Sequence, residues 1–265
     1  MQLSLAGWSL HPLFRSAVDP LQLLDFPRFT LDNFGIEAVE LNNIFFASTE
    51  PAYLKQLVAA ADSAGVKLLN IAVDEKGDLA GEDDAARELG LANYLRWVPI
   101  AAELGCTAIR ANSGGKTIVD RARAIKRCIE SFRHLADAGR KHGIAILMEN
   151  HGGLSVDADS IIQVIQAVIK SHGPDAVGTL PDFGNWPENA DREGSLRKIL
   201  PYAKAVHAKV MEIGPDLSHP KFDLGKCVQI THEAGYEGYL GIEFEGTGDL
   251  IESVKRAVRK LTPLL

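Results

Sequence analysis

The sequence lacks the paired cysteines, long apolar segments and excess of basic residues that are typical of disulfide-linked, membrane and nucleic-acid-binding proteins. Its three cysteines are scattered, odd in number and without metal-site spacing, so we expect reduced thiols in a cytoplasmic protein. No apolar run is long enough to span a membrane, and residues 1–8 lack the basic segment and apolar core of a signal peptide. The formal net charge of -7 argues against a nucleic-acid backbone as the main partner. We therefore predict neither a membrane nor a nucleic-acid partner, and the sequence leaves open whether the chain forms a homo-oligomer.

A glycine-rich phosphate cradle is also missing after the first expected strand, where the chain reads Ser9-Leu10-His11-Pro12. Short apolar strands alternate with longer amphipathic helices eight times, and no break in composition interrupts them. This pattern predicts one α/β domain over residues 1–265, a single (β/α)8 TIM barrel. A doubly wound open sheet is the alternative, but it would normally carry the missing glycine fingerprint.

The expected elements can be placed along the chain. We predict strands over residues 3–8, 38–42, 67–73, 107–112, 145–149, 177–182, 205–210 and 239–245. We predict helices over residues 20–34, 51–64, 85–104, 119–142, 157–171, 192–200, 224–234 and 250–261, with Asp157 as an N-cap and a loop over 74–84.

One stretch, residues 145–153, organises the rest of the sequence. Four apolar residues run directly into Glu149, Asn150 and His151, and two glycines follow. A short strand that is apolar on both faces is typical of a parallel sheet covered by helices. A carboxylate at its end is costly unless it is paired with a cation or binds a metal.

Polar residues recur at the ends of the neighbouring strands, where barrel enzymes carry their active sites. They are Glu40, Asn42, Arg110, Asn112, Glu149, His151, Asp182, His207, Lys209, Glu243 and Glu245. Several carboxylates at one barrel mouth repel one another unless a cation lies between them. A mixed set of carboxylate oxygens and imidazole nitrogen predicts one divalent metal ion, Mn²⁺ first, with Mg²⁺, Co²⁺, Zn²⁺ or Fe²⁺ as alternatives.

At this point the chain resembles the xylose isomerase-like TIM barrels, also described as the sugar phosphate isomerase/epimerase superfamily. The resemblance covers nearly the whole chain. It is carried by residues 35–40, 102–110, 149–153, 181–185, 207–209 and 241–245. Members bind one divalent metal through Glu, Asp, His and Glu on strands five to eight, which implies Glu149, Asp182, His207 and Glu243 as the metal ligands.

The chain departs from the ketose 3-epimerase branch at three places. Asn185 stands where that branch tends to have a substrate-binding His, and no acid follows Glu149 within residues 152–155. Lys209 is the nearest cation after His207, where that branch has an Arg further along. The His-x-Lys and Glu-Asn-His patterns look more like the isomerase, inosose-dehydratase and keto-sugar-processing branches.

These features imply a metal-dependent sugar isomerase or epimerase that abstracts a proton next to a carbonyl, through an enediolate. We expect a small sugar or polyol as the substrate, and catalytic roles for Glu149, Glu243, Lys209 and His151. We expect Arg110, Asn112, Asn185 and Glu40 to contact the substrate, although Arg110 could instead pair with Glu149 or Glu40.

Three other functions compete with this one. A dehydratase or lyase acting on an inosose or a 3-keto-glycoside would use the same metal site. A non-catalytic sugar-binding barrel is a further alternative. Phosphodiester hydrolysis by a cluster of three metals is disfavoured, because it would require more strand-end histidines than this chain has.

Overall fold

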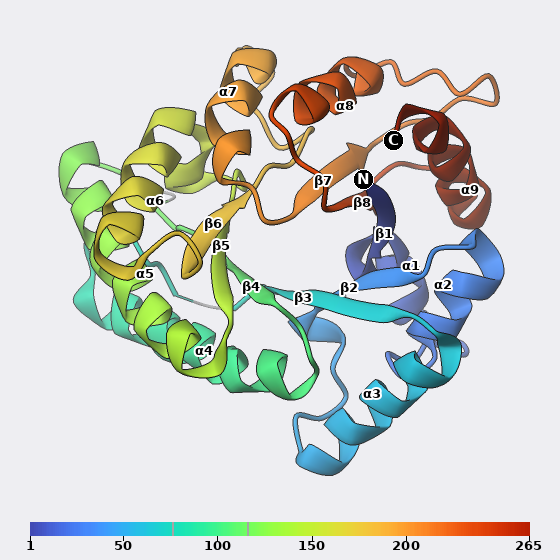
Figure 1. Ribbon diagram of the computed structural model, residues 1–265, viewed down its shortest axis with the longest axis horizontal. Coiled ribbons are helices and arrows are strands. Elements are labelled where there is room, and N and C mark those ends of the chain that lie inside the picture. Colours follow the sequence, from blue (N-terminus) through green and yellow to red (C-terminus); the bar gives the residue numbers. More distant parts are fainter. Residues whose placement is uncertain (76, 116) are drawn as a thin grey trace.

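The fold is a parallel barrel surrounded by helices in this computed structural model, which describes residues 1–75, 77–115 and 117–265 (Figure 1). The described residues form eight strands: β1 (Gln2–Ala6), β2 (Ala38–Asn42), β3 (Lys67–Val73), β4 (Ala108–Ala111), β5 (Ala145–Glu149), β6 (Val177–Leu180), β7 (Val206–Val210) and β8 (Tyr239–Phe244). All paired neighbours run parallel, in the order β6-β5-β4-β3-β2-β1-β8-β7. Isolated parallel bridges, Thr179 with Ala203 and Asp182 with His207, join β6 to β7 and close the ring. The predicted (β/α)8 barrel is therefore confirmed.

Helices follow the strands and form the outer layer, which buries the outward-facing apolar side chains of the barrel. They are α1 (His11–Phe14), α2 (Phe26–Phe34), α3 (Pro51–Ala64), α4 (Asp84–Glu103), α5 (Arg121–His142), α6 (Ala158–His172), α7 (Arg192–Ile199), α8 (Leu224–Glu233) and α9 (Leu250–Leu261). Short 3-10 turns cover η1 (Gly7–Leu10), η2 (Asn43–Phe45), η3 (Gly153–Val156), η4 (Leu200–Tyr202) and η5 (Thr262–Leu264). No helix in the described residues is long and apolar enough to cross a membrane.

Aspartates begin most of the longer helices. Asp157 accepts a hydrogen bond from the backbone N–H of Ser160, as its predicted N-cap role requires. Asp120 and Asp223 cap α5 and α8 in the same way. These caps fix the point where each strand-end loop enters its helix, and so they fix the loops around the barrel mouth.

The prediction of a helix from residue 20 to 34 was wrong at its start. The chain instead forms η1 and α1 directly after β1, and α2 begins only at Phe26. Pro27 lies in the first turn of α2, where its missing N–H costs no helical hydrogen bond, whereas it would remove one from a helix that began at Pro20. The predicted loop over 74–84 is confirmed up to its last residue, where α4 begins; its residue 76 lies outside the described residues.

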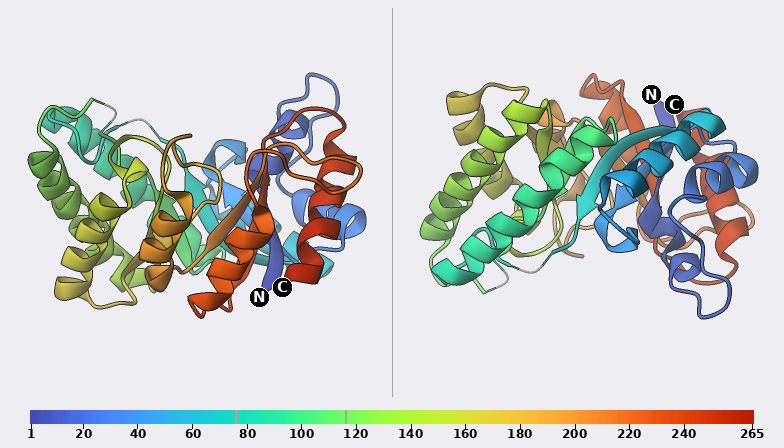
Figure 2. Two further views of the ribbon diagram at one scale, coloured as in Figure 1. Left: turned by 90° about the horizontal axis from the view of Figure 1, so that it is seen from above. Right: turned by 90° about the horizontal axis from the view of Figure 1, so that it is seen from below.

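The two ends of the barrel differ in what they carry. The N- and C-termini lie side by side at one end in both views of Figure 2. The opposite end collects the carboxyl ends of all eight strands. The acidic and basic side chains predicted at the strand ends gather there, and several of them are fully buried.

Candidate metal centre

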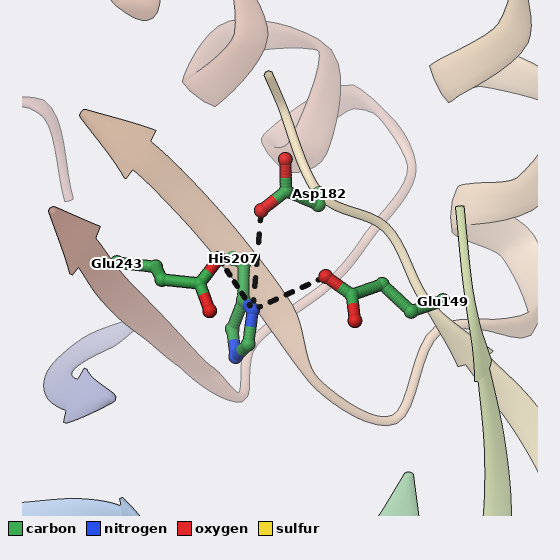
Figure 3. A group of neighbouring side chains, drawn as sticks. All are labelled: Glu149, Asp182, His207 and Glu243. Atoms are coloured by element: carbon green, nitrogen blue, oxygen red, sulfur yellow. Dashed lines mark ion pairs between the residues drawn. The ribbon is translucent and has the colours of Figure 1, made fainter. Parts of the chain in front are cut away.

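Four side chains from consecutive strands meet at the carboxyl end of the barrel (Figure 3). Glu149 ends β5, Asp182 lies two residues past β6, His207 is on β7 and Glu243 is on β8. Each is buried and offers one ligand atom, and these atoms all lie within 4.8 Å of one another. Glu149 and Glu243 lie on opposite sides of His207, with Asp182 between them.

His207 points one ring nitrogen at the carboxylates and the other away from them. Its Nδ1 lies 3.7 Å from Glu149 Oε1, 3.9 Å from Asp182 Oδ2 and 3.7 Å from Glu243 Oε2. These separations are too long for hydrogen bonds, and Nδ1 makes none within the described residues. They leave space for an ion in the middle of the four atoms.

Glu40 determines which nitrogen of His207 is free. Glu40 Oε2 lies 2.9 Å from His207 Nε2, so a proton on Nε2 can be donated to the carboxylate. Burial would lower the pKa of His207, but Glu40, Glu243 and Glu149 raise it, so a metal ion bound at Nδ1 would replace a proton there. Ser4 and Asn70 also donate hydrogen bonds to Glu40, at 2.7 and 2.8 Å. Gly241 provides the room, because a Cβ atom there would lie 2.2 Å from Glu40 Oε1.

Asp182 is held by its backbone and by one of its two oxygens. Asn150 accepts a hydrogen bond from the Asp182 N–H at 2.7 Å and donates one to its carbonyl at 2.9 Å. Asp182 Oδ1 accepts from the N–H groups of Gly184 and Asn185 at 2.7 and 2.8 Å. Oδ2, which faces His207, has no hydrogen bond within the described residues. The carboxylate is thus aimed with one oxygen available for a ligand.

Glu149 is held by a buried arginine. Arg110 Nε lies 3.0 Å from Glu149 Oε2, and Arg110 Nη1 lies 2.8 Å from Asp74 Oδ1. Asn185 donates a hydrogen bond to Glu149 Oε1 at 3.0 Å. Burial alone would raise the pKa of Glu149, but Arg110, His207 and His151 together outweigh it and hold the pKa well below its usual range.

Lys209 enters the same cluster from β7. Its Nζ lies 2.7 Å from Glu243 Oε2, 3.0 Å from Glu245 Oε2 and 3.9 Å from Asp182 Oδ2. Burial would lower the pKa of this ammonium, but the carboxylates outweigh it and raise the pKa. Gly184 leaves space for the lysine stem, since a Cβ there would lie 2.6 Å from Lys209 Cγ. Trp8 Nε1 donates a hydrogen bond to the other oxygen of Glu245.

The charges that remain favour a cation. Burial raises the pKa of Asp182 to about 7, and the negative charges of Glu243 and Glu149 add to this although Lys209 opposes it. The free inward atoms of His207 and Asp182 match the nitrogen and oxygen donors that a divalent ion takes. The residues present therefore fit a bound metal ion at this position.

The remaining predicted residues lie around this cluster. Asn185 and Arg110 contact Glu149 directly, and Glu40 is buried behind His207. Asn112 contacts Asp74, and exposed His151 lines a neighbouring cavity. The substrate and catalytic roles that we predicted for these residues stay predictions, and the contacts of Glu40 and Arg110 are with the residues that would hold the metal.

Sequence reasoning missed four contributors. They are Ser4, Asn70, Asp74 and Asn150. Asn150 had a signal, because it lies inside the Glu-Asn-His stretch on the face opposite Glu149. Asp74 had no such signal, because nothing in the sequence distinguishes it from the other acidic residues of its loop.

Comparisons with known proteins agree with this architecture. A family model described as xylose isomerase-like TIM barrel matches residues 30–264. The chain belongs to this family. A putative hydroxypyruvate isomerase from Homo sapiens is 26% identical over 239 residues, which are 83% of this chain and 83% of the human protein.

Solved structures share the fold over the full length of the chain. A D-tagatose 3-epimerase-like protein superposes with a TM-score of 0.76 and 16% identity, covering 100% of this chain and 98% of that one. A 3-keto-D-glucoside 4-epimerase from E. coli gives a TM-score of 0.75 and 15% identity, with coverage of 100% and 98%. At such identities the likeness concerns the fold alone.

Proposed function

We propose that the protein is a divalent-metal-dependent isomerase or epimerase that moves a proton at the carbon next to a keto group. The observation that carries this proposal is the buried cluster of Glu149, Asp182, His207 and Glu243. A carboxylate lies on each side of His207, and the inward atoms of His207 and Asp182 have no hydrogen bond within the described residues. The names of the relatives, a putative hydroxypyruvate isomerase and two sugar epimerases, support the same reaction class.

A divalent ion held by these four residues would draw charge from the carbonyl and the adjacent hydroxyl of the substrate and lower the pKa of the C–H bond between them. The protein's part is to move the proton. Glu149 would act as the base, since its contacts with Arg110 and Asn185 keep it ionised and fix its direction. Glu243, on the opposite side, would return a proton to the other face or to the neighbouring carbon.

Lys209 would serve as a charged hydrogen-bond donor. Its raised pKa keeps it protonated, which suits it to stabilise negative charge on a substrate oxygen. The raised pKa makes Lys209 less suited to donate a proton to a departing hydroxyl. This favours the isomerase or epimerase over the lyase alternative that uses the same site.

The test is a solvent-exchange screen. Chelator-treated protein, reloaded with Mn²⁺, is incubated in D₂O with hydroxypyruvate, ketopentoses, ketohexoses, inososes and 3-keto-glycosides, and deuterium incorporation is read by mass spectrometry. We expect metal-dependent exchange at one carbon next to the carbonyl of at least one substrate class. Absence of exchange on every class, with Mn²⁺ bound, would contradict the proposal and favour a non-catalytic sugar-binding barrel.

A further inference from the structure

A cavity of about 710 Å³ lies beside the metal centre, at the ends of β3, β4 and β5. The lining residues include Asp74, Tyr94, Asn112 and His151. It adjoins the proposed reaction site because Asp74 and Glu149 are bound to the same guanidinium, that of Arg110. His151 follows Glu149 by two residues. A molecule whose reacting carbons lay at the four-residue cluster could therefore extend into this cavity.

The wall of the cavity is preformed by close backbone packing. Gly153 adopts a left-handed φ of 57°, and a Cβ there would lie 2.1 Å from the carbonyl oxygen of Gly114. A Cβ at Gly114 would in turn lie 2.0 Å from Asp78 Oδ1, which accepts a hydrogen bond from Gly115 N–H at 2.7 Å. The loops after β3, β4 and β5 thus fit together only because glycines stand at these contacts.

Two buried polar atoms on this wall have unused hydrogen-bonding capacity. Tyr94 is 3% exposed, and its hydroxyl accepts from the Asn112 N–H at 3.1 Å, while the structure shows no acceptor for its own proton among the described residues. Asn112 Oδ1 is buried and has no donor among those residues. Such groups are usually satisfied, so they indicate a polar partner in the cavity.

The remaining chemistry of the lining suits hydroxyl groups. Asp74 Oδ1 is bound to Arg110 and lies 3.4 Å from Asn112 Nδ2. Asp74 Oδ2 has no hydrogen-bond donor among the described residues and can accept from a ligand. Glu75 and Asp78 also line the cavity. Carboxylates accept hydrogen bonds from hydroxyls. The volume falls within the range of about 300–1,000 Å³ that is typical of small-molecule sites, and a three-carbon keto acid would fill little of it.

We propose that this cavity binds the hydroxyl-bearing remainder of a keto sugar of more than three carbons, through Tyr94, Asn112 and Asp74. The proposal rests on the proposed function and names the substrate class for that site. It separates this protein from an isomerase whose substrate is a three-carbon keto acid.

The test uses probes that cannot react. Binding of xylitol and glucitol, which carry no carbonyl, is measured by ligand-observed NMR and calorimetry on the Mn²⁺-loaded protein. Tyr94→Phe removes one hydroxyl and keeps the ring, so we expect alditol binding to weaken about three- to tenfold. Tyr202→Phe is the matched control and should leave alditol binding unchanged. Tyr202 precedes β7, at the other end of the barrel, and its hydroxyl accepts a hydrogen bond from Gln166. Thermal unfolding checks that both variants fold.

The activity arm compares chain lengths. We expect Tyr94→Phe to lower kcat/KM on a ketopentose or ketohexose by a similar factor and to leave any turnover of hydroxypyruvate unchanged. Unaltered alditol binding in Tyr94→Phe, or turnover confined to hydroxypyruvate, would overturn the cavity proposal while leaving the reaction class intact. Alditol binding that depends on Tyr94 without exchange on any substrate would remove the proposed function and leave the binding site standing.

Discussion

The two halves of the barrel mouth supply different kinds of residues: candidate metal ligands in one half, and the groups that contact those ligands in the other. The half built from β5 to β8 supplies Glu149, Asp182, His207 and Glu243, whose inward atoms surround one point. The half built from β1 to β4 supplies the groups behind them: Ser4, Glu40, Asn70 and Arg110. Arg110 and Glu40 contact the outward atoms of Glu149 and His207. One half would bind the ion, and the other half would fix how the ligands face it.

This division follows from the cost of burying charge. Removing an ion from water costs several kcal/mol. Buried side chains that keep their inward atoms free for a metal therefore need hydrogen-bond or charge partners for their outward atoms. Arg110 and Lys209 supply positive charge to Glu149 and Glu243, and Asn150 and two backbone N–H groups hold Asp182. The comparison between the halves can be tested by changing one side at a time.

The largest effect is expected at a ligand itself, Glu243→Gln. The amide is a weaker metal donor and cannot carry a proton, so kcat should fall by about 10²- to 10⁴-fold and Mn²⁺ should bind more weakly. The measurements are turnover in the exchange assay and calorimetric titration with Mn²⁺. Glu237→Gln, at an exposed position before β8, is the control and should resemble the parent protein. A protein that stays fully active after exhaustive chelation would contradict this assignment.

Lys209→Met tests the lysine that the β5–β8 half supplies to its own cluster. The substitution removes the charge beside Glu243 and keeps an unbranched side chain, so Mn²⁺ should still bind while kcat falls by about 100-fold. Without Mn²⁺ the variant should be less stable, because Glu243 and Asp182 lose their nearest positive charge. Exposed Lys204 provides the control variant Lys204→Met. Normal turnover of Lys209→Met would reduce Lys209 to an ion-pair partner.

Glu40→Gln tests the supporting half. Glutamine keeps the size of the side chain but weakens its hold on His207 Nε2, so the Mn²⁺ dissociation constant should rise about 10- to 100-fold. At saturating Mn²⁺, kcat should approach that of the parent protein if Glu40 acts through His207, behind which it is buried, and not through the substrate. Exposed Glu37→Gln is the control.

Gly241→Ala provides an independent check of the same contact. Its added Cβ would press on Glu40 and on the His207 ring, where Cδ2 would lie only 3.0 Å away. It should therefore weaken Mn²⁺ binding in the same direction. Unchanged affinity in both Glu40→Gln and Gly241→Ala would show that the two halves are not coupled through His207.

The sequence was more informative about the β5–β8 half than about the other. Glu149, His207 and Glu243 belong to short apolar strands, in which a polar or charged side chain is conspicuous. The carboxyl ends of all strands of a parallel barrel lie at the same end, so these side chains could be placed together. Glu40 stands out in the same way, but strand position could not tell a substrate contact from a partner for His207. That distinction depends on the absence of a side chain at Gly241, which only the pairing of β1 with both β2 and β8 makes visible.

Loop residues could not be assigned from the sequence for a different reason. Asp74 lies in an acidic loop where any of several carboxylates could have met Arg110, and the choice is made by Asn43, which accepts a hydrogen bond from the Asp74 N–H at 2.8 Å. The start of α2 was also missed, although Pro27, which suits the first turn of a helix, was a local signal for it. The non-local contact with Asn43 decides only the case of Asp74.

The smallest expected effect concerns how metal binding stabilises each half. Cys106 precedes β4 and Cys227 lies on α8, between β7 and β8, and both are buried. Burial disfavours the thiolate and raises the pKa of each thiol to about 12, so at pH 8 nearly all of each thiol is protonated and reaction with iodoacetamide requires local opening. Because all four ligands come from β5–β8, saturating Mn²⁺ should slow labelling of Cys227 by a few-fold more than labelling of Cys106. Peptide mass spectrometry of protein labelled with and without Mn²⁺ measures both sites in one sample. Equal protection of the two thiols would mean that they open together in a global event, and the two halves would then differ in chemistry but not in local stability.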